Sequence, residues 1–307
     1  MNTTSPLAVA DRSFGKRTRA DEIVRGMDLS GRLVVVTGAN AGIGFETARS
    51  LASAGAHVVL GCRRRDAADE AASRIRARHP DARVEASGLD LASYDSVRAF
   101  AERLEADNVD VLVCNAGVVN MRYRETESGF EHTVGVCHLG HFLLTHELLP
   151  RLLAGGSGRV VVVSSESHRS PATLDFDRLP LSRERYHGLV AYGQAKLCNV
   201  LFANELQRRC HDRGLTACSL HPGTLVTTRI GRDAWWVRLV MLLVSPFTKN
   251  AAQGAATSVY CATHPDGEEI GGRYFDHCRP KRGSRESNDA AVAARLWTLS
   301  EGWVGIA

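Results

Sequence analysis

Leu33-Val-Val-Val-Thr-Gly-Ala-Asn-Ala-Gly-Ile-Gly44 ("LVVVTGANAGIG") is the stretch of the sequence that decides the fold. Its β-branched run over residues 33–37 is typical of a buried parallel strand. Gly38, Gly42 and Gly44 follow, and a helical pattern begins among them in "GIGFETARSLASAG". We therefore predict a strand, a glycine-rich turn and a helix at this point of the chain.

The same alternation of strand and helix patterns continues along the sequence without hairpin signals. Such alternation predicts a parallel sheet with helices on both faces. The predicted fold class is therefore α/β, a single-domain Rossmann fold with a doubly wound parallel sheet. After the strand "AHVVLGC", we expect helices over 66–79, 94–107 (capped by Ser93), 128–153 and 190–212, strands over 83–87, 109–114, 159–164 and 215–220, and a last helix–strand pair ending at "GGRYFD".

One domain is expected, because no repeat, low-complexity tract or proline-rich linker divides the chain. Residues 1–30 are polar and irregular, and they are predicted to form an arm on the domain surface. Residues 31–280 are predicted to form the domain, with a substrate lid over about 228–250, and residues 281–307 a C-terminal tail.

The composition argues against several classes of protein. The apolar fraction of 44% and the charged fraction of 23% are those of a soluble globular protein. The net charge is only +4 and no Lys/Arg block occurs, so nucleic acid is not an expected partner. The eight cysteines are scattered without metal-ligand spacing, which predicts buried free thiols, a cytoplasmic location and no metal. The sequence has no signal-peptide pattern and no apolar run near the ~20 residues of a membrane span.

The glycine-rich turn and the end of the second strand predict a dinucleotide cofactor and its type. Glycines before a helix allow a pyrophosphate to approach the free backbone N–H groups of the helix N-terminus. An NAD enzyme usually places Asp or Glu at the second strand end, whereas Cys62 stands here, followed by Arg63, Arg64 and Arg65. Guanidinium groups bind a 2′-phosphate well, so NADP(H) is favoured, although Arg65 also fits a solvated start of a helix.

Tyr192 and Lys196 form an i, i+4 pair on one face of a predicted helix in "AYGQAKLCN". A phenol ionises near about pH 10 and is a poor proton donor or acceptor at neutral pH, but a nearby ammonium stabilises its phenolate. The strand "RVVVV" ends at Ser164 and Ser165, either of which could hold a substrate oxygen.

These motifs as a set resemble the short-chain dehydrogenase/reductase family. They are Thr37–Gly44, "CNAG" (114–117), the strand-end serines, Tyr192-xxx-Lys196 and "HPGTLVT" (221–227), in the family's order over roughly residues 28–280. Segments such as "VVVSSESHR", "KLCNVLFANEL" and "QGAATSVYCA" resemble the oxidoreductase domain of WW-domain-containing oxidoreductases, with retinol dehydrogenases as near relatives.

The resemblance implies roles for individual residues. Tyr192 would exchange a proton with the substrate oxygen, Lys196 would support it and hold the nicotinamide ribose, and Ser165, the second serine of the pair, would orient the carbonyl. Asp90 would contact the adenine and Asn115 would lie beside the adenosine ribose. The complete set of implied cofactor-binding residues is Gly38, Asn40, Gly42, Ile43, Gly44, Arg63, Arg64, Asp90, Leu91, Asn115, Ala116, Gly117, Tyr192, Lys196, Pro222, Gly223 and Thr227.

Cys137 is the main departure from the family pattern. It stands in "VCHLGHF", where family members commonly have an asparagine that helps to hold a water linking the lysine to solvent. A thiol is a weak donor and a weak acceptor, which predicts slower but not abolished catalysis. A buried thiol without a function and a redox-sensitive thiol are the alternatives. His138 and His141 are expected to serve packing and local hydrogen bonds, and Cys114 carries little meaning.

The segment "DAWWVRLVMLLVSPF" (233–247) falls in the predicted lid and offers an apolar wall. It favours a lipophilic alcohol or carbonyl substrate that is retinoid-, steroid- or polyketide-like, with a core helix or interfacial membrane docking as alternatives. The predicted function is an NADP(H)-dependent oxidoreductase. The alternative is an NADP(H)-binding regulatory or scaffold protein with catalysis weakened by Cys137. A homodimer or homotetramer is a further hypothesis, because the helices carrying Cys137 and Tyr192 resemble those through which family members associate.

Overall fold

The structure is a computed structural model that describes residues 14–179, 183, 186–223 and 250–306 of the chain. Its sheet contains β1 (Leu33–Thr37), β2 (His57–Cys62), β3 (Val84–Gly88), β4 (Val111–Cys114), β5 (Arg159–Val163), β6 (Thr216–His221), β7 (Tyr274–Asp276) and β8 (Arg279–Lys281). The helices are α1 (Ala20–Ile23), α2 (Gly42–Ser53), α3 (Arg65–Arg78), α4 (Tyr94–Glu102), α5 (His132–Val134), α6 (Gly140–Ala154), α7 (Gly188–Cys210), α9 (Ala251–Thr263), α10 (Gly267–Ile270) and α11 (Ala290–Val304). A π-helical segment, η2 (Gly135–Leu139), joins α5 to α6, and single turns of 3₁₀-helix lie at η3 (Glu166–Arg169), η4 (Phe176–Arg178), η5 (His211–Arg213) and η7 (Glu286–Asn288).

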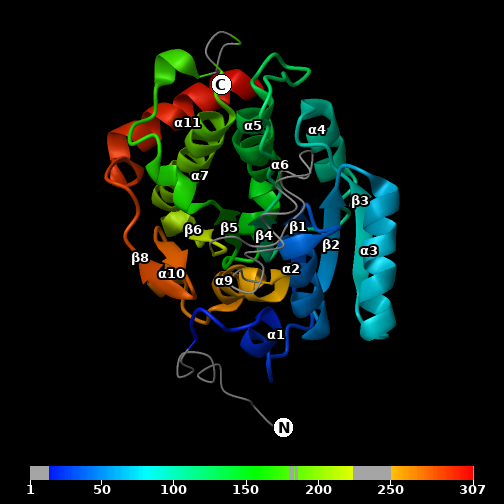
Figure 1. Cartoon of the computed structure of the whole chain (residues 1–307). Coiled ribbons are helices and arrows are strands. Elements are labelled where there is room, and N and C mark those ends of the chain that lie inside the picture. The colour runs from blue at the N-terminus through cyan, green and yellow to red at the C-terminus, as the bar shows by residue number, and fades with distance from the viewer. Residues whose placement is uncertain (1–13, 180–182, 184–185, 224–249, 307) are drawn as a thin grey trace, which may run out of the picture.

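The eight strands form one sheet in the order β3-β2-β1-β4-β5-β6-β7-β8 (Figure 1). All neighbouring pairs are parallel except β7 and β8, which are antiparallel. The chain leaves β1 towards one edge of the sheet and returns after β3 to lay down β4 on the other side of β1. Ligands of open α/β sheets bind at such a switch point, outside the carboxyl ends of the strands.

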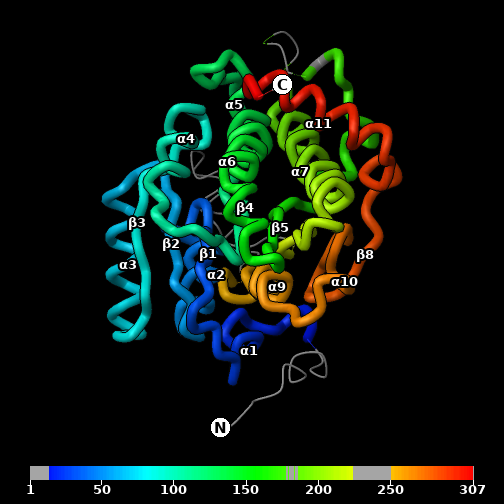
Figure 2. Tube along the Cα trace, turned by 180° about the vertical axis from the view of Figure 1, so that it is seen from behind, coloured from blue at the N-terminus to red at the C-terminus, as the bar shows by residue number. Residues whose placement is uncertain are grey.

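Two apolar layers hold helices on opposite faces of the sheet (Figures 1 and 2). Alternate strand residues face each layer, as Val34 and Val36 do on one side and Leu33 and Val35 on the other. The first layer joins the sheet to α1, α2, α3 and α9, and the second joins it to α4, α6, α7 and α11. The predicted doubly wound Rossmann fold in a single domain is therefore confirmed.

Several predicted elements differ in detail from the structure. The sheet is not wholly parallel, because β8 adds an antiparallel edge. The helix expected over 128–153 begins only at His132 and contains the π-helical segment. Ser93 is the N-cap residue of α4, but its side chain makes no capping hydrogen bond.

The regions expected as arm and tail both contain helices that pack on the domain. Ala20 and Ile23 of α1 are fully buried, and α1 packs on α9. In the C-terminal region, α11 packs on α7. Its Trp297 lies edge-on to Phe142 of α6, with ring centroids 4.9 Å apart. None of the described helices is long and apolar enough to cross a membrane.

Candidate active site

The glycine-rich turn between β1 and α2 has the shape that a pyrophosphate needs. Gly38 has a φ of 65°, a left-handed conformation that favours glycine. A Cβ on Gly44 would collide with the Asn115 side chain and the Gly38 carbonyl, so only glycine fits there. The N-terminus of α2 has no side-chain cap, which leaves its first N–H groups available to an anion. These residues fit the dinucleotide phosphates.

Asn115 at the end of β4 braces this turn. Its Nδ2 donates to the Thr37 carbonyl at 2.8 Å, and the backbone N–H groups of Asn115 and Ala116 both donate to Thr37 Oγ1 at 2.9 Å. The sequence did not reveal that the Thr37 hydroxyl and the His141 ring help to hold this turn in place. Because the Cys137 carbonyl can only accept, His141 Nδ1–H donates to it at 3.1 Å, and Nε2 accepts from the Thr37 hydroxyl at 2.8 Å.

The end of β2 places a neutral group where many NAD enzymes have a carboxylate. The Cys62 thiol is buried beside the backbone N–H groups of Ala39 and Asn40, and burial raises its pKa to about 11. Arg63, Arg64 and Arg65 are all exposed. Arg64 pairs with Asp66 and Arg65 with Asp69, whereas Arg63 makes no ion pair with any residue that the structure describes. A free guanidinium therefore stands at this strand end.

Tyr192 and Lys196 lie on the same face of α7, as the spacing predicts. Lys196 Nζ lies 5.5 Å from the centroid of the Tyr192 ring. Lys196 is 3% exposed and donates to the Val163 carbonyl at 2.9 Å, while Asn199 Nδ2 donates to the same carbonyl at 3.2 Å. Asn199 was not predicted as a site residue, although it lies in the quoted motif. The ammonium is thus fixed beside the half-buried phenol.

Cys137 lies beside Lys196, where the family's asparagine is expected. A Cβ built on Gly117 would lie 3.4 Å from Lys196 Nζ and 3.7 Å from Cys137 Sγ, so all three meet. The sulfur accepts from the Val118 N–H at 3.4 Å and donates to the Val118 carbonyl at 3.6 Å. Burial raises the pKa of the thiol, against the opposing charge of Lys196, so it is protonated at neutral pH.

The two strand-end serines have different surroundings. Ser164 is 2% exposed, and its hydroxyl donates to the Lys196 carbonyl at 2.7 Å. Ser165 is half-buried, and among the residues that the structure describes its hydroxyl bonds to Ser167 alone, through the backbone N–H and Oγ, both at 3.2 Å. Ser165 is therefore the serine that can turn towards a substrate.

The remaining predicted residues lie around the same carboxyl edge of the sheet. Asp90 Oδ1 accepts from the Ala92 N–H at 3.0 Å, and Leu91 is buried against Gly140. Pro222 and Gly223 directly follow β6. Thr227 and the predicted lid over 228–250 lie outside the described residues, apart from Asn250 at the start of α9.

A dinucleotide cradle at the switch point and a tyrosine–lysine pair on the neighbouring helix define an NAD(P)-dependent oxidoreductase that acts on CH–OH groups. The chain belongs to the short-chain dehydrogenase family, whose description "short chain dehydrogenase" matches residues 32–175. The resemblance predicted from the motifs is thus confirmed.

Three comparisons show how broad the likeness is. The chain is 48% identical to the WW domain-containing oxidoreductase of Danio rerio over 97% of this chain and 74% of that protein. It is 43% identical to retinol dehydrogenase 12 of Mus musculus over 91% of this chain and 88% of that protein. Among solved structures, an uncharacterized protein from Mycobacterium paratuberculosis is 35% identical with a TM-score of 0.75, covering 92% of this chain and 97% of that one.

Proposed function

We propose that this protein is an NADP(H)-dependent reductase of lipophilic carbonyl compounds, working also in the reverse direction on the corresponding alcohols. The cofactor, when bound, supplies or accepts the hydride. The chain's own residues orient the substrate and move its proton. Ser165 holds the carbonyl oxygen, Tyr192 protonates it, and Lys196 stabilises the phenolate that results.

The neutral thiol of Cys62 beside the free guanidinium of Arg63 supports NADP(H) over NAD(H). A carboxylate at this strand end would repel a 2′-phosphate, and no carboxylate stands there. A guanidinium without a partner can form paired, charge-assisted hydrogen bonds to the phosphate.

The test compares Arg63→Leu with Arg65→Leu. One charge-assisted hydrogen bond contributes about 1.5–3 kcal/mol, so Arg63→Leu should weaken NADPH binding by about 10- to 100-fold and leave NADH binding unchanged. Arg65→Leu, whose guanidinium already pairs with Asp69, should change both little. Equal losses for NADPH and NADH in Arg63→Leu would contradict the assignment.

Exposed apolar side chains near Tyr192 support a lipophilic substrate. Met121, Leu189 and Val190 are 66%, 57% and 42% exposed and are the exposed large hydrophobic residues of the described chain. A Cβ on Gly188 would collide with the backbone of residues 120 and 121, so the two segments that carry them touch. The name of the similar retinol dehydrogenases points the same way. A panel of aldehydes and ketones of increasing chain length should show KM falling with length; preference for short polar carbonyls would refute the proposal.

A second candidate function is an NADP(H)-binding protein with little catalysis. Cys137 favours it, because the thiol donates to and accepts from the Val118 backbone, which uses its only proton. NADPH oxidation by native protein and by Cys137→Asn distinguishes the two. Activity found only in the asparagine variant would favour the binding protein, and activity in both would favour the reductase.

We also propose a reducing, cytoplasmic setting for this activity. All eight cysteines are free and buried, which supports it. Fractionation of cells that express the tagged protein would test the location, and recovery of the protein outside the cytosolic fraction would contradict it.

A further inference from the structure

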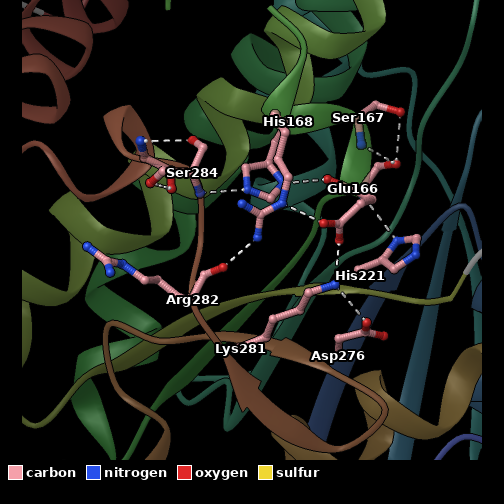
Figure 3. A network of polar contacts seen from close by, with 11 residues as sticks. Glu166, Ser167, His168, His221, Asp276, Lys281, Arg282 and Ser284 are labelled. Atoms are coloured by element: carbon pink, nitrogen blue, oxygen red, sulfur yellow. Dashed lines mark hydrogen bonds and ion pairs between the residues drawn. The ribbon is translucent and has the colours of Figure 1, made fainter. Parts of the chain in front are cut away.

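The loop that carries Ser165 is bound to the chain segment that begins with the last residue of β8 (Figure 3). His168 of η3 lies between them, and Glu166 and Arg169 reach the same segment from either side of it. The segment contains Lys281, Arg282 and Ser284 and lies far beyond the match to the family description, which ends at residue 175. The residues that make these contacts are not among the site residues that the resemblance implies.

His168 is held in a single tautomer by its two partners. Its side chain is fully buried, and its ring packs against Tyr274 with centroids 4.7 Å apart. The Ser284 backbone N–H donates to Nε2 at 3.1 Å, so Nε2 must be unprotonated. Nδ1 therefore carries the proton and donates it to the Ser165 carbonyl at 2.7 Å. Burial lowers the pKa of His168, in keeping with a neutral ring.

An outer set of ion pairs surrounds this contact. Lys281 Nζ lies 2.9 Å from Glu166 Oε2 and 3.1 Å from Asp276 Oδ2, and Glu166 also pairs with Arg169. Arg169 donates in addition to the Arg282 carbonyl. Lys281 and Glu166 are each 39% exposed, so these pairs contribute little individually. The buried histidine joins the loop to Ser284, and the Glu166 backbone N–H also donates to His221 Nδ1 at 3.3 Å.

The loop also lies directly against the helix of the catalytic tyrosine. A Cβ on Gly193, next to Tyr192, would collide with the Ser170 carbonyl. A small shift of the loop would therefore change the distance between the Ser165 hydroxyl and the Tyr192 phenol. A misplacement of about 1 Å can reduce turnover by about 100-fold.

We propose that His168 is a positioning residue for Ser165, and that the segment after β8 holds it there through the Ser284 backbone. The proposal rests on the proposed function, because it assigns Ser165 to the substrate carbonyl. It makes residues 281–284 a part of the active-site support, more than a hundred positions along the chain from Ser165.

A matched pair of amides separates the two hydrogen bonds of the ring. The amide nitrogen of His168→Asn is as many bonds from Cα as Nδ1, so it can still donate to Ser165. The amide oxygen of His168→Gln is as many bonds from Cα as Nε2, so it can still accept from Ser284 but cannot replace the side-chain donor to the Ser165 carbonyl. The backbone N–H of residue 168, which donates to the Ser165 carbonyl at 3.1 Å, is kept in both variants, so the pair tests the side-chain hydrogen bonds alone. Both variants lose one buried hydrogen bond and should lose similar thermal stability. His146→Gln, at an exposed position of α6, is the control.

We expect kcat in the glutamine variant to fall on the order of 100-fold and that of the asparagine variant to fall far less, with NADPH affinity unchanged in both. Losses that follow thermal stability rather than the identity of the amide would overturn the proposal. Hydrogen–deuterium exchange of residues 160–170 gives a reading that needs no turnover, so inactivity of the native protein would refute the proposed function alone. Faster exchange in the glutamine variant would support the positioning role of His168, and unchanged exchange would refute it. In the native protein, ¹⁵N shifts of His168 must report the Nδ1–H tautomer; the Nε2–H tautomer would refute it even if neither variant folds.

Discussion

Two buried histidines of the helix behind the cofactor turn should make the stability of this protein depend on pH. His138 and His141 are each 1% exposed. Burial lowers the pKa of His138 from 6.5 to about 3 and that of His141 from 6.5 to about 4; the hydrogen bond to the Cys137 carbonyl raises the pKa of His141, and the charge of Lys196 lowers it. Both rings are neutral in the folded protein at neutral pH.

The sign follows from which state takes up protons first. Below pH 6.5 the unfolded chain binds a proton on each histidine, whereas the folded protein does so only near pH 4 for His141 and near pH 3 for His138. The free energy of unfolding therefore has its full value above pH 6.5 and falls as the pH drops below 6.5. Each histidine contributes a slope of about 1.4 kcal/mol per pH unit within this window. Between about pH 7.5 and about pH 5.5 the two together should remove on the order of 2–3 kcal/mol.

Urea unfolding at a series of pH values, with native protein, His138→Gln and His141→Gln, measures this directly. Each glutamine also removes a hydrogen bond, so the variants should be less stable at every pH. The slope is the informative quantity, and it should decrease by about 1.4 kcal/mol per pH unit in each variant. His146→Gln controls for the substitution itself. Slopes in the two buried variants equal to the native slope would refute the reasoning, because burial would then not oppose protonation.

Three further predictions concern Gly193, Trp297 and Tyr192. Gly193→Ala should disrupt the contact with Ser170 and lower both Tm and kcat. The control Gly302→Ala, in a helix with free space around that position, should raise Tm slightly. Equal effects of the two substitutions in thermal melts and activity assays would contradict this prediction. Trp297→Ala should cost about 3–5 kcal/mol in urea unfolding because the ring is 9% exposed among aromatic neighbours, and a cost below about 1 kcal/mol would mean that α11 is not integral to the domain. Tyr192→Phe should abolish carbonyl reduction and leave NADPH binding intact, and full turnover in that variant would overturn the assigned role.

Most of the fold could be predicted because it depends on local patterns. The strand Leu33–Thr37 is a run of β-branched and apolar residues, and its burial on both faces follows from a parallel sheet covered by helices. The chain after β7 was harder to predict. β8 reads "RPK", three exposed residues with a proline, which is a poor strand signal. The signal for α11 was present, since Asp289 caps its first turn and Gly305 ends it with a φ of 70°.

The π-helical segment could not be predicted, because tertiary contacts determine it. A Cβ on Gly135 would collide with Thr126, and one on Gly140 would collide with the Leu91 carbonyl. These two contacts bring the helix close to neighbouring segments, and within the π-helical segment the Cys137 carbonyl accepts from the His141 side chain. The hydrogen bond between His168 and Ser284 could not be predicted from the sequence either, because the two residues are 116 positions apart and Ser284 contributes only its backbone N–H.

The geometry of Cys137 places the effect of this departure from the family on one step. The sulfur keeps the connection to the Val118 backbone, so the helix stays attached to the strand end that carries Gly117. A thiol has one proton to donate, and Val118 takes it, so no donor is left for a water beside Lys196. Ser165, Tyr192 and the ammonium of Lys196 are all retained. If the proposed function holds, we therefore expect the loss to fall on the supply of protons to the lysine after turnover, and not on the proton and hydride transfers to the substrate.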